Sequence, residues 1–386
     1  MSFALPYTDE HRAFRETVRR FVEREVVPHH REWENQGRVP RELWRKAGEL
    51  GFLCPALPAE YGGGGGDFLL STIVTEELCW AGATGPLFYL HSDIVAPYLL
   101  HYGTEEQKRK WLPRMASGQT ISGICMTEPG AGSDVAAIRT RAVRKSGRDG
   151  DDFVISGQKI FISNGQIADL FLVAAKTDPE AGAKGVSLVL VESDRPGFAR
   201  GRNLEKIGMH AQDTSELFFD EVRVPASNLL GAEGKGFGYL MSQLPQERLL
   251  VAIGAVAAAE SAIKWTLDYV RDRKAFGAPL AEKQHVRFAL TEAHTEVTIG
   301  RAFLDHCIAL HLEGKLDTAT ASMAKYWLSD MQNRVIDACL QLHGGYGYMW
   351  EYPIARAWAD ARVQRIYGGA NEIMKEIIAR KLFEGR

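Results

Sequence analysis

The sequence predicts an α+β protein of three parts: an N-terminal helical domain, a small central β domain of barrel-like or sandwich-like form, and a C-terminal four-helix bundle. Near Thr120 the spacing of apolar residues changes from helical to strand-like, and after Gly231 it becomes helical again. Most of the helices expected after Gly231 are long enough to pack as an antiparallel bundle. We place the three domains at residues 1–118, 119–230 and 231–386.

The N-terminal part is predicted to be helical from Thr8 to about residue 118. Thr104 and Gln107 have the spacing of a capping box, in which each side chain bonds the backbone N–H of the other residue at a helix start. Pro40 favours a helix start and Gly51 a helix end, which predicts a short helix between them. The glycine run at residues 62–66 lacks the rest of a phosphate-binding motif, so we interpret it as a surface loop.

The central part contains short runs rich in β-branched and aromatic residues, separated by Gly, Asp, Asn and Pro, as is typical of strands. These runs are "ISGICM", "FVISGQKIFIS", "DLFLVAAKT", "GVSLVLVE" and "ELFFDEVRV". The helices that follow are expected at about 245–272, 282–313, 317–343, 353–365 and 371–383. The order of helices, sheet and bundle is therefore readable from periodicity alone.

Composition limits the classes of function. The chain of 386 residues has a formal net charge of −3, so it offers no basic surface of the kind that nucleic acid or an anionic membrane attracts. No apolar run approaches the roughly 20 residues of a membrane span, and the N-terminus lacks the apolar core of a secretion signal. The five cysteines form no CxxC pair and are interpreted as reduced, mostly buried thiols. We expect a cytoplasmic protein that neither binds nucleic acid nor inserts into a membrane.

Absent motifs exclude several enzyme classes. The sequence contains no GxGxxG, GxxxxGK[ST], HExxH or GxSxG pattern. Two SxxK matches, at Ser156 with Lys159 and at Ser261 with Lys264, lack their companion motifs and are interpreted as chance. The histidines show no metal-ligand spacing, so no metal site is expected. A metal hydrolase and a serine hydrolase are both disfavoured.

Four loops carry candidate chemistry. "MTEPGAGSD", residues 126–134, offers backbone N–H groups and the hydroxyls of Thr127 and Ser133, which suits a phosphate or a ring edge; a plain turn explains it equally well. "GQKIFISNG", residues 157–165, places Phe161 and Ser163 on one strand face, an aromatic plane beside a hydroxyl, as any half-buried strand could. "QLHGGYGY" and "RIYGGANEI" place paired glycines between helices, where glycine either ends a helix or lets a ligand approach the backbone.

Glu247 stands in "QLPQERLL", directly before a long apolar run. Local rules explain it as a residue of a helix start: Pro245 is favoured at the first helical position, and the helix macrodipole stabilises a carboxylate in the first turn. That placement would hold the pKa of Glu247 below its usual value of about 4.3. The local pattern alone leaves this structural explanation and a functional one open.

Taken together, five blocks resemble the acyl-CoA dehydrogenase family, in the family's order and over essentially the whole chain. They are "MTEPGAGSD", "GQKIFISNG", "RDRKAFG", "QLHGGYGY" with "EYPIARAWADAR", and "RIYGGANEIMKEIIARK". The resemblance implies FAD held between the β domain and the bundle. It also implies a homotetramer or homodimer, in which a neighbouring subunit touches the cofactor, and reoxidation by an electron-transferring flavoprotein.

Carried over residue by residue, the resemblance assigns FAD contacts to matching positions. Residues 124–133 match the loop along the flavin and pyrophosphate, Phe161 matches the aromatic residue against the flavin ring, and Ser163 matches the hydroxyl at flavin N5. Arg273, Phe276, Gln284 and the stretch 341–345 match positions that reach FAD from the other subunit. The cofactor residues implied are Cys125, Met126, Thr127, Gly132, Ser133, Phe161, Ile162, Ser163, Arg273, Phe276, Gln284, Gln341, Leu342, Gly344, Gly345, Gly369, Ala370, Asn371 and Glu372. Ala370 departs from the family, since many relatives carry Thr there, which puts one hydroxyl contact in doubt.

The resemblance also locates the base. The medium-chain and short-chain branches carry their catalytic glutamate at the position of Gly368, which is glycine here. The long-chain and isovaleryl branches carry a glutamate early in the first bundle helix instead, and "LPQERLL" matches the long-chain version with Glu247 in that place. We therefore predict Glu247 as the base, with the backbone N–H of Gly368 as a donor to the thioester oxygen. Ser133, Arg248, Tyr367 and Gly368 are predicted to contact the substrate, although Arg248 could also be a solvated surface charge.

The reaction implied is removal of an α-proton and a β-hydride from an acyl-CoA thioester, as in fatty acid β-oxidation. Binding of the acyl chain would expel water and raise the pKa of Glu247. Three alternatives stay open: an acyl group carried on an acyl carrier protein, an oxidase or monooxygenase that uses oxygen, and a catalytically silent helical scaffold. Acyl chain length, branching and the pathway are not specified by these residues.

Overall fold

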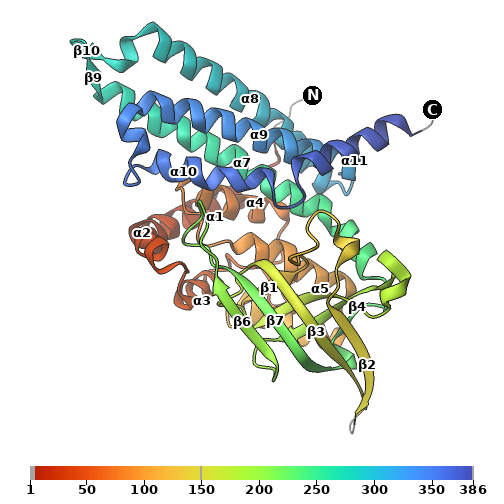
Figure 1. Ribbon diagram of the computed structural model, residues 1–386. Coiled ribbons are helices and arrows are strands. Elements are labelled where there is room, and N and C mark those ends of the chain that lie inside the picture. The colour runs from red at the N-terminus through yellow and green to blue at the C-terminus, as the bar shows by residue number, and fades with distance from the viewer. Residues whose placement is uncertain (1–4, 148–149, 385–386) are drawn as a thin grey trace.

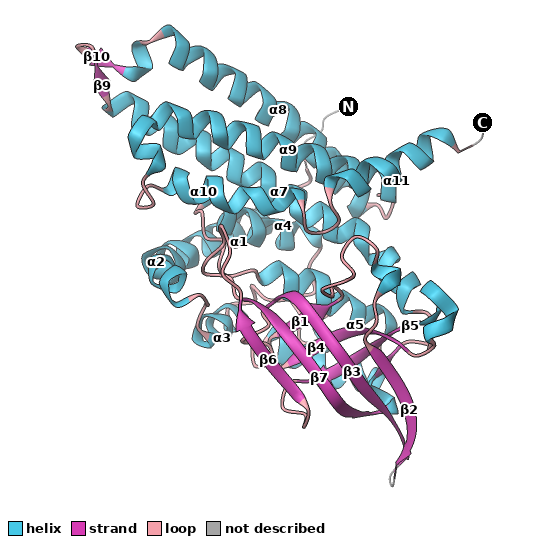
Figure 2. Ribbon diagram, in the orientation of Figure 1, coloured by secondary structure: helices cyan, strands magenta, loops and turns pink. Residues whose placement is uncertain are grey.

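The computed structural model describes residues 5–147 and 150–384, and it confirms the α+β fold of N-terminal helices, central β domain and C-terminal helices (Figures 1 and 2). The N-terminal elements are α1 (Asp9–Phe21), η1 (Val22–Val26), α2 (Val27–Gln36), α3 (Arg41–Glu49), η2 (Ala59–Tyr61), α4 (Phe68–Trp80), η3 (Leu90–Val95), α5 (Ala96–Tyr102) and α6 (Glu105–Ala116). The domain boundaries given above stay predictions.

Helix ends in this part follow the expected chemistry. Thr104 and Gln107 form a complete capping box at the start of α6. The helix α3 begins directly after Pro40, and Gly51 follows its end in the left-handed region at φ +73. The glycine run lies in an irregular segment before α4, as predicted. These local signals depend on neighbouring residues only, which is why the sequence predicts them well.

The segment η3 is a π-helix that runs directly into α5. Its hydrogen bonds span five residues instead of four, a geometry that occurs mostly as single turns and frequently at functional sites. All six of its residues are buried, among them Asp93. Pro97 then occupies the first turn of α5, and because the helix is continuous with η3, its missing N–H takes one donor away from the carbonyls of the preceding turn.

The β domain is one strongly bent sheet with the strand order β6-β7-β3-β2-β4-β5-β8, and β1 pairs with β4. Its strands are β1 (Ser122–Cys125), β2 (Arg141–Gly147), β3 (Gly150–Ser163), β4 (Leu170–Lys176), β5 (Val186–Glu192), β6 (Phe198–Asn203), β7 (Thr214–Pro225) and β8 (Leu229–Leu230). A single register pair, Arg141 with Lys176, joins β2 to β4. The bend between the two halves therefore lies at β2 and β4.

The strand β4 lies in the centre and is buried on both faces. Its alternate residues serve two cores, since side chains along a strand point to opposite sides. Phe171 and Val173 pack with strand residues and with Trp44 of the N-terminal helices, whereas Leu170 and Leu172 belong to the core shared with the C-terminal helices. This explains why β4 reads as a continuous apolar run rather than as an alternation.

The C-terminal part is helical, with a small two-stranded hairpin between its first two helices. The elements are α7 (Gly236–Asp272), β9 (Lys274–Ala275), β10 (Ala278–Pro279), η7 (Leu280–Glu282), α8 (Gln284–Leu312), α9 (Thr318–His343), η8 (Gly344–Tyr348), α10 (Pro353–Ala361), η9 (Arg362–Arg365) and α11 (Asn371–Phe383). The helix expected to run to residue 365 ends earlier, because α10 stops at Ala361 and continues as the 3-10 turn η9.

The start predicted for the first bundle helix was wrong: α7 begins at Gly236, and Pro245 lies inside it. Tertiary contacts of the preceding turns outweigh the proline. Leu240 is fully buried, and the Tyr239 ring stacks on Tyr102 of α5 with ring centroids 4.0 Å apart. Glu247 is therefore in the middle of a helix of 37 residues and not in its first turn.

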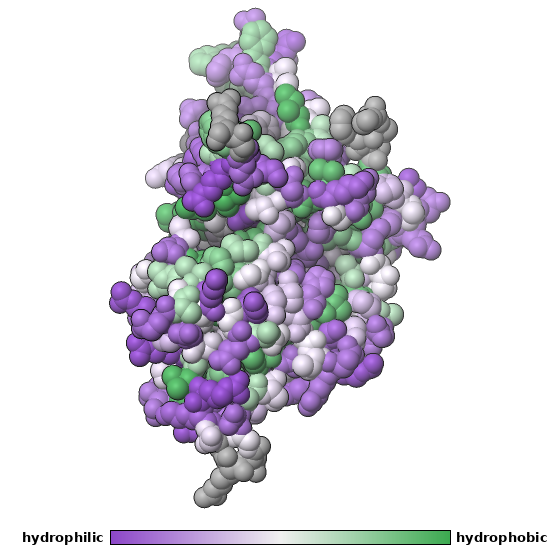
Figure 3. All heavy atoms as spheres, turned by 90° about the vertical axis from the view of Figure 1, so that its right-hand side faces the viewer, coloured by the Kyte–Doolittle hydropathy of each residue, from purple (hydrophilic) through white to green (hydrophobic). Residues whose placement is uncertain are grey.

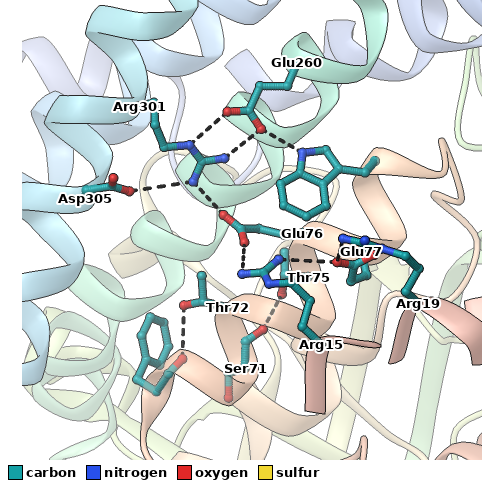
Figure 4. A network of polar contacts seen from close by, with 12 residues as sticks. Arg15, Arg19, Ser71, Thr72, Thr75, Glu76, Glu77, Glu260, Arg301 and Asp305 are labelled. Carbon is teal, nitrogen blue, oxygen red and sulfur yellow. Dashed lines mark hydrogen bonds and ion pairs between the residues drawn. The ribbon is translucent and has the colours of Figure 1, made fainter. Parts of the chain in front are cut away.

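An ionic cluster joins the N-terminal helices to the bundle (Figure 4). Glu76 of α4 lies between two guanidiniums, those of Arg15 from α1 and Arg301 from α8. Arg301 also forms a bidentate pair with Glu260 of α7 and lies 3.7 Å from a carboxylate oxygen of Asp305. Four helices thus meet at one set of charges in which each carboxylate of α4 has a cationic partner.

Helix α7 is long and apolar enough, in one stretch, to cross a membrane by length and composition. However, 78% of that stretch is buried inside the protein, as in the core helix of a folded domain. The face of the molecule drawn in Figure 3 carries mainly hydrophilic residues with smaller hydrophobic patches between them.

Candidate active site

Glu247 is only 5% exposed, and its closest polar partner comes from a distant part of the chain. The Tyr98 hydroxyl of α5 donates a hydrogen bond of 2.8 Å to Oε1 of Glu247, and Tyr98 itself is fully buried. Burial raises the pKa of Glu247 to about 7, and the Tyr98 hydroxyl and the nearby Arg248 charge lower it only in part. The expectation that a helix start lowers this pKa was wrong, because the macrodipole acts only near the helix end.

The turn of α7 around Pro245 is attached to η3 and α5 by two side chains that precede Glu247. Gln246 donates through Nε2 to the carbonyl of Asp93 at 2.6 Å. The side-chain amide of Gln243 lies 2.8 Å from Nδ1 of His101. The base therefore directly follows a turn of α7 that is hydrogen-bonded to the η3–α5 segment.

Gly368 lies beside the same face of α7. It has φ +65, and a Cβ built on it would meet Cγ2 of Val251 at 3.5 Å. Val251 follows Glu247 by one turn, so the two side chains share a helix face. The segment is held from α9: Nζ of the fully buried Lys325 donates to the carbonyl of Gly369 at 2.6 Å and to Oδ1 of Asn371 at 2.9 Å. Burial lowers the pKa of Lys325 to about 8.

The other predicted substrate residues of the helices have defined partners. Arg248 is buried and donates to Oγ of Ser322 on α9 at 3.2 Å, so a solvated surface charge is excluded. Its Nε has no partner among the described residues. The Tyr367 hydroxyl donates to Oε1 of Gln364 at 2.8 Å and lies 3.4 Å from the Tyr89 hydroxyl. Burial raises the pKa of Tyr367 well above its usual value.

The loop after β1 is stabilised by an ion pair that the sequence reading did not identify. Lys159 of β3 donates from Nζ to Glu128 at 2.8 Å and to the carbonyl of Met126 at 3.0 Å. Glu128 also accepts from the backbone N–H groups of Arg139 and Thr140. This pair explains Lys159 structurally, in agreement with interpreting its SxxK match as chance. Within the loop Cys125 is buried, Thr127 accepts from the N–H of Ile160, and Ser133 is exposed.

The surface beside this loop has the shape needed for a flat ring and a phosphate. Phe161 is 63% exposed at φ +60, Ser163 is half-buried, and Ile162 between them is buried, so Phe161 and Ser163 share the outer face. A Cβ built on Gly130 or Gly132 would meet nothing within 4 Å. The Phe161 ring is exposed and lies next to an open, glycine-containing loop. This arrangement fits a surface that binds FAD better than it fits a ring that packs in a core.

A second set of predicted cofactor residues lies at the far end of the bundle, around the β9–β10 hairpin (Figure 1). Phe276 at the hairpin turn is 99% exposed. A pocket of about 580 Å³ opens beside it, lined by residues that include Arg273, Gln341, Leu342, Gly344 and Gly345. Gln284 begins α8 at the same end. Within a single chain, this set is far from Phe161 and Ser163, which belong to the β domain.

The remaining predicted cofactor residues begin α11. Ala370 is the N-cap of α11 and provides no side-chain hydrogen bond, so the departure noted in the sequence leaves the cap without a hydroxyl. Asn371 is buried and donates to Ser329 and Asp330 of α9. Glu372 is exposed. In the part of the chain that the structure describes, no group of His, Cys, Asp and Glu could hold a metal ion.

Three of these contacts could not be identified from the sequence. Tyr98 and Glu247 are 149 positions apart, and nothing near either residue indicates the pairing. Lys325 is an isolated lysine in an amphipathic helix, and Glu128 stands in a loop where its backbone partners depend on the fold. For Lys325 the sequence offers only its position in a mostly apolar stretch, and for Glu128 it offers no such signal.

Comparison with known proteins agrees with this geometry. The chain matches the family description "Acyl-CoA dehydrogenase" with its N-terminal domain at residues 8–119, its middle domain at 123–222 and its C-terminal domain at 234–383. The long-chain specific acyl-CoA dehydrogenase, mitochondrial, of Sus scrofa is 54% identical over 378 residues, 97% of this chain and 87% of that protein.

Solved structures show the same fold. The acyl-CoA dehydrogenase from Geobacillus kaustophilus has a TM-score of 0.95 and 52% identity, covering 98% of this chain and 100% of its own. A glutaryl-CoA dehydrogenase from Mycobacterium smegmatis in complex with FADH2 has a TM-score of 0.90 and 30% identity, covering 98% of this chain and 95% of its own. The chain therefore belongs to the acyl-CoA dehydrogenase family of oxidoreductases.

Proposed function

We propose that this protein is an FAD-dependent dehydrogenase that converts a long-chain acyl-CoA thioester to its trans-2-enoyl-CoA, with Glu247 as the base. One observation carries the proposal: Glu247 is a buried carboxylate that has no cationic ion-pair partner among the described residues, and it lies on the helix face that Gly368 lies against. The pig relative supports a long acyl chain, since its name states that specificity. A role in fatty acid β-oxidation is consistent with this substrate.

The proton transfer follows from the environment of Glu247. A buried carboxylate with a pKa of about 7 is a much stronger base than an exposed glutamate, yet about half of it is ionised at pH 7 and most of it at pH 8. It accepts the α-proton, and the electron pair of the broken C–H bond stays on the substrate. Negative charge then develops on the thioester oxygen, and we assign its stabilisation to the backbone N–H of Gly368. Lys325 contributes by holding the carbonyl of the next residue, Gly369.

FAD, when bound, supplies the acceptor for the β-hydride. Phe161, Ser163 and the loop at residues 126–133 would hold it on the β-domain side, because they present an exposed ring, a hydroxyl and open glycine positions. Gly369 and Ala370 would contact it from the start of α11. Ser133 would lie between cofactor and substrate, while Arg248 and Tyr367 would line the substrate side from within the bundle.

The far set around Phe276 favours a homodimer or homotetramer. Arg273, Gln284 and the stretch 341–345 lie at the hairpin end of the bundle, far from the strand β3 that carries Phe161 (Figure 1), so they could complete an FAD site only on a second copy of the chain. Light scattering on the purified protein tests this; a monomer that retains FAD tightly would contradict it. Transfer of electrons to an electron-transferring flavoprotein, and location in the cytoplasm, stay predictions.

Glu247→Gln tests the function directly. The variant should fold, bind FAD and bind acyl-CoA, because the amide keeps the shape of the side chain and can still accept from Tyr98. Reduction of the flavin by a long-chain acyl-CoA, followed as bleaching under anaerobic conditions, should slow by about four orders of magnitude or more. Asp268→Asn is the matched control, since this carboxylate lies on the same helix but is exposed. Bleaching of Glu247→Gln at the wild-type rate would refute the assignment.

The alternatives give different outcomes. Formation of hydrogen peroxide in step with turnover would indicate an oxidase. Preference for an acyl-acyl-carrier-protein over the matching acyl-CoA would change the substrate but not the base. A purified protein without flavin absorbance would favour a silent scaffold. A panel of straight and branched acyl-CoAs in the same bleaching assay would determine the preferred chain.

A further inference from the structure

The hydrogen bond between Tyr98 and Glu247 divides the two carboxylate oxygens into different roles. Oε1 receives the Tyr98 hydroxyl at 2.8 Å, and no other hydrogen bond from the described residues reaches the Glu247 side chain. Oε2 is therefore the oxygen without a protein donor. Since a carboxylate rotates about its last bond, one fixed oxygen also fixes the direction in which the other one points.

Tyr98 is rigid enough to fix this direction. It is fully buried, and it belongs to α5, which Pro97 and the π-helix η3 hold at one end. Gln246, next to the base, donates to the Asp93 carbonyl of η3, so α7 and the η3–α5 segment cannot shift independently. The distance between the phenol and the base is thus set by two packed helices rather than by a loop.

The other titratable or charged groups near Glu247 are directed elsewhere. Arg248, on the same helix, donates to Ser322 of α9, and its charge acts on Glu247 only from a distance. Lys325 of α9 is engaged with Gly369 and Asn371. The Asp93 carboxylate of η3 accepts from Ser71 of α4. On the side of the loop before α11, Tyr367 donates to Gln364. Within residues 5–147 and 150–384, Tyr98 is the one group that donates to the carboxylate itself.

We propose that Tyr98 is a positioning residue for the base: by donating to Oε1 it holds the Glu247 carboxylate in one orientation and leaves Oε2 to take the α-proton. This rests on the function proposed above. Before the reaction the hydroxyl stabilises the ionised carboxylate, which has no other direct donor in its dry surroundings. After transfer the proton is on Oε2 and the Tyr98 bond to Oε1 persists, so no other proton has to move.

Tyr98→Phe removes the hydroxyl and keeps the ring. The hydroxyl favours the ionised carboxylate, so its loss should raise the pKa of Glu247 and move the acidic limb of the flavin-reduction rate upward by about one pH unit. At pH 6 the rate should fall about tenfold, because the ionised fraction falls by that factor. Loss of orientation should lower the rate at pH 9 as well, while KM for the acyl-CoA changes little. A purely structural role would lower Tm without moving the acidic limb.

Tyr102→Phe is the matched control. Tyr102 is one turn further along α5, its hydroxyl accepts from Gln243 and its ring stacks on Tyr239, but it does not reach Glu247. Its variant should keep the acidic limb of the wild type. The inference is overturned if the acidic limb of Tyr98→Phe lies at the same pH as that of the wild type.

A second variant covers the case in which Tyr98→Phe does not fold. Site-specific incorporation of 3,5-difluorotyrosine at position 98 nearly preserves the volume and provides a more acidic phenol, which is a stronger donor. The acidic limb should then move to lower pH, and an unmoved limb would overturn the inference. Failure of this proposal is distinct from failure of the function. An active Glu247→Gln variant would refute the proposed function. If Glu247→Gln is inactive but the variants at position 98 keep the wild-type acidic limb, only the positioning role of Tyr98 is refuted.

Discussion

Two buried glutamates of this protein have opposite surroundings. Glu76 of α4 is 2% exposed and lies between the guanidiniums of Arg15 and Arg301 (Figure 4). Glu247 of α7 is 5% exposed and receives one hydrogen bond from a neutral phenol. The first arrangement pairs a carboxylate with two cations and makes it part of the packing between helices. The second leaves the carboxylate free to exchange a proton, which shows that burial produces a base only where cationic partners are absent.

The largest effect is expected from Glu76→Gln. Loss of the shared charge leaves Arg15 and Arg301 without their common partner in a mostly buried place, which should lower the free energy of unfolding by about 3–5 kcal/mol. Urea denaturation of the flavin-loaded protein measures this. Glu60→Gln is the control, because this glutamate is exposed and its change should stay within about 0.5 kcal/mol. A loss below about 1 kcal/mol for Glu76→Gln would show that the cluster does not stabilise the fold.

Glu247→Gln should raise the free energy of unfolding at high pH, whereas Glu76→Gln lowers it. The pKa of Glu247 is about 7 in the folded protein and near 4.5 in the unfolded chain, so its favourable contribution is complete below pH 4.5 and is lost as the pH rises through 7. The uncharged variant should match the wild type near pH 4 and exceed it by about 3 kcal/mol at pH 9. Urea denaturation across this range measures the difference. A pH-independent difference would mean that Glu247 is not a buried titrating group.

The smallest effect is expected from Asp305→Asn, at the edge of the ionic cluster. Asp305 lies 3.7 Å from Arg301, and burial raises its pKa to about 6, so its charged form costs stability as the pH rises through 6. The variant should differ from the wild type by less than about 1 kcal/mol at pH 8, with the sign neutral or stabilising. A large loss at pH 8 would place Asp305 among the essential partners of Arg301, beside Glu76 and Glu260.

Much of this molecule could be predicted from its sequence, and the limits have physical causes. The order of helices, sheet and bundle follows from apolar periodicity, and the cap at Thr104 follows from two side chains three residues apart. The start of α7 could not be predicted, because packing of Leu240 and Tyr239 outweighs the preference of Pro245 for a helix start. Local propensity is a weak guide wherever tertiary contacts are this extensive.

The candidate site divides in the same way. Glu247 could be identified because it is a carboxylate directly before a long apolar run and because its block resembles one branch of a family. The direction of its pKa shift could not be predicted, since that depends on burial by α5 and on the hydroxyl of Tyr98, which is 149 positions away. Similarly, the sequence indicates the residues around Phe276 as cofactor contacts, but only the structure shows that they lie at the hairpin end of the bundle, far from the strand β3 that carries Phe161.

The number of residues in the π-helix η3 determines where the Tyr98 hydroxyl lies relative to Glu247. Each residue of a helix turns the chain by about 100°, so deleting one residue between Leu90 and Val95 could restore an ordinary α-helix at little local cost. The same deletion would turn the segment from Ala96 onward by about that angle and carry the Tyr98 hydroxyl away from Glu247. The segment is thus more sensitive to a change in the number of its residues than to many changes in their identity.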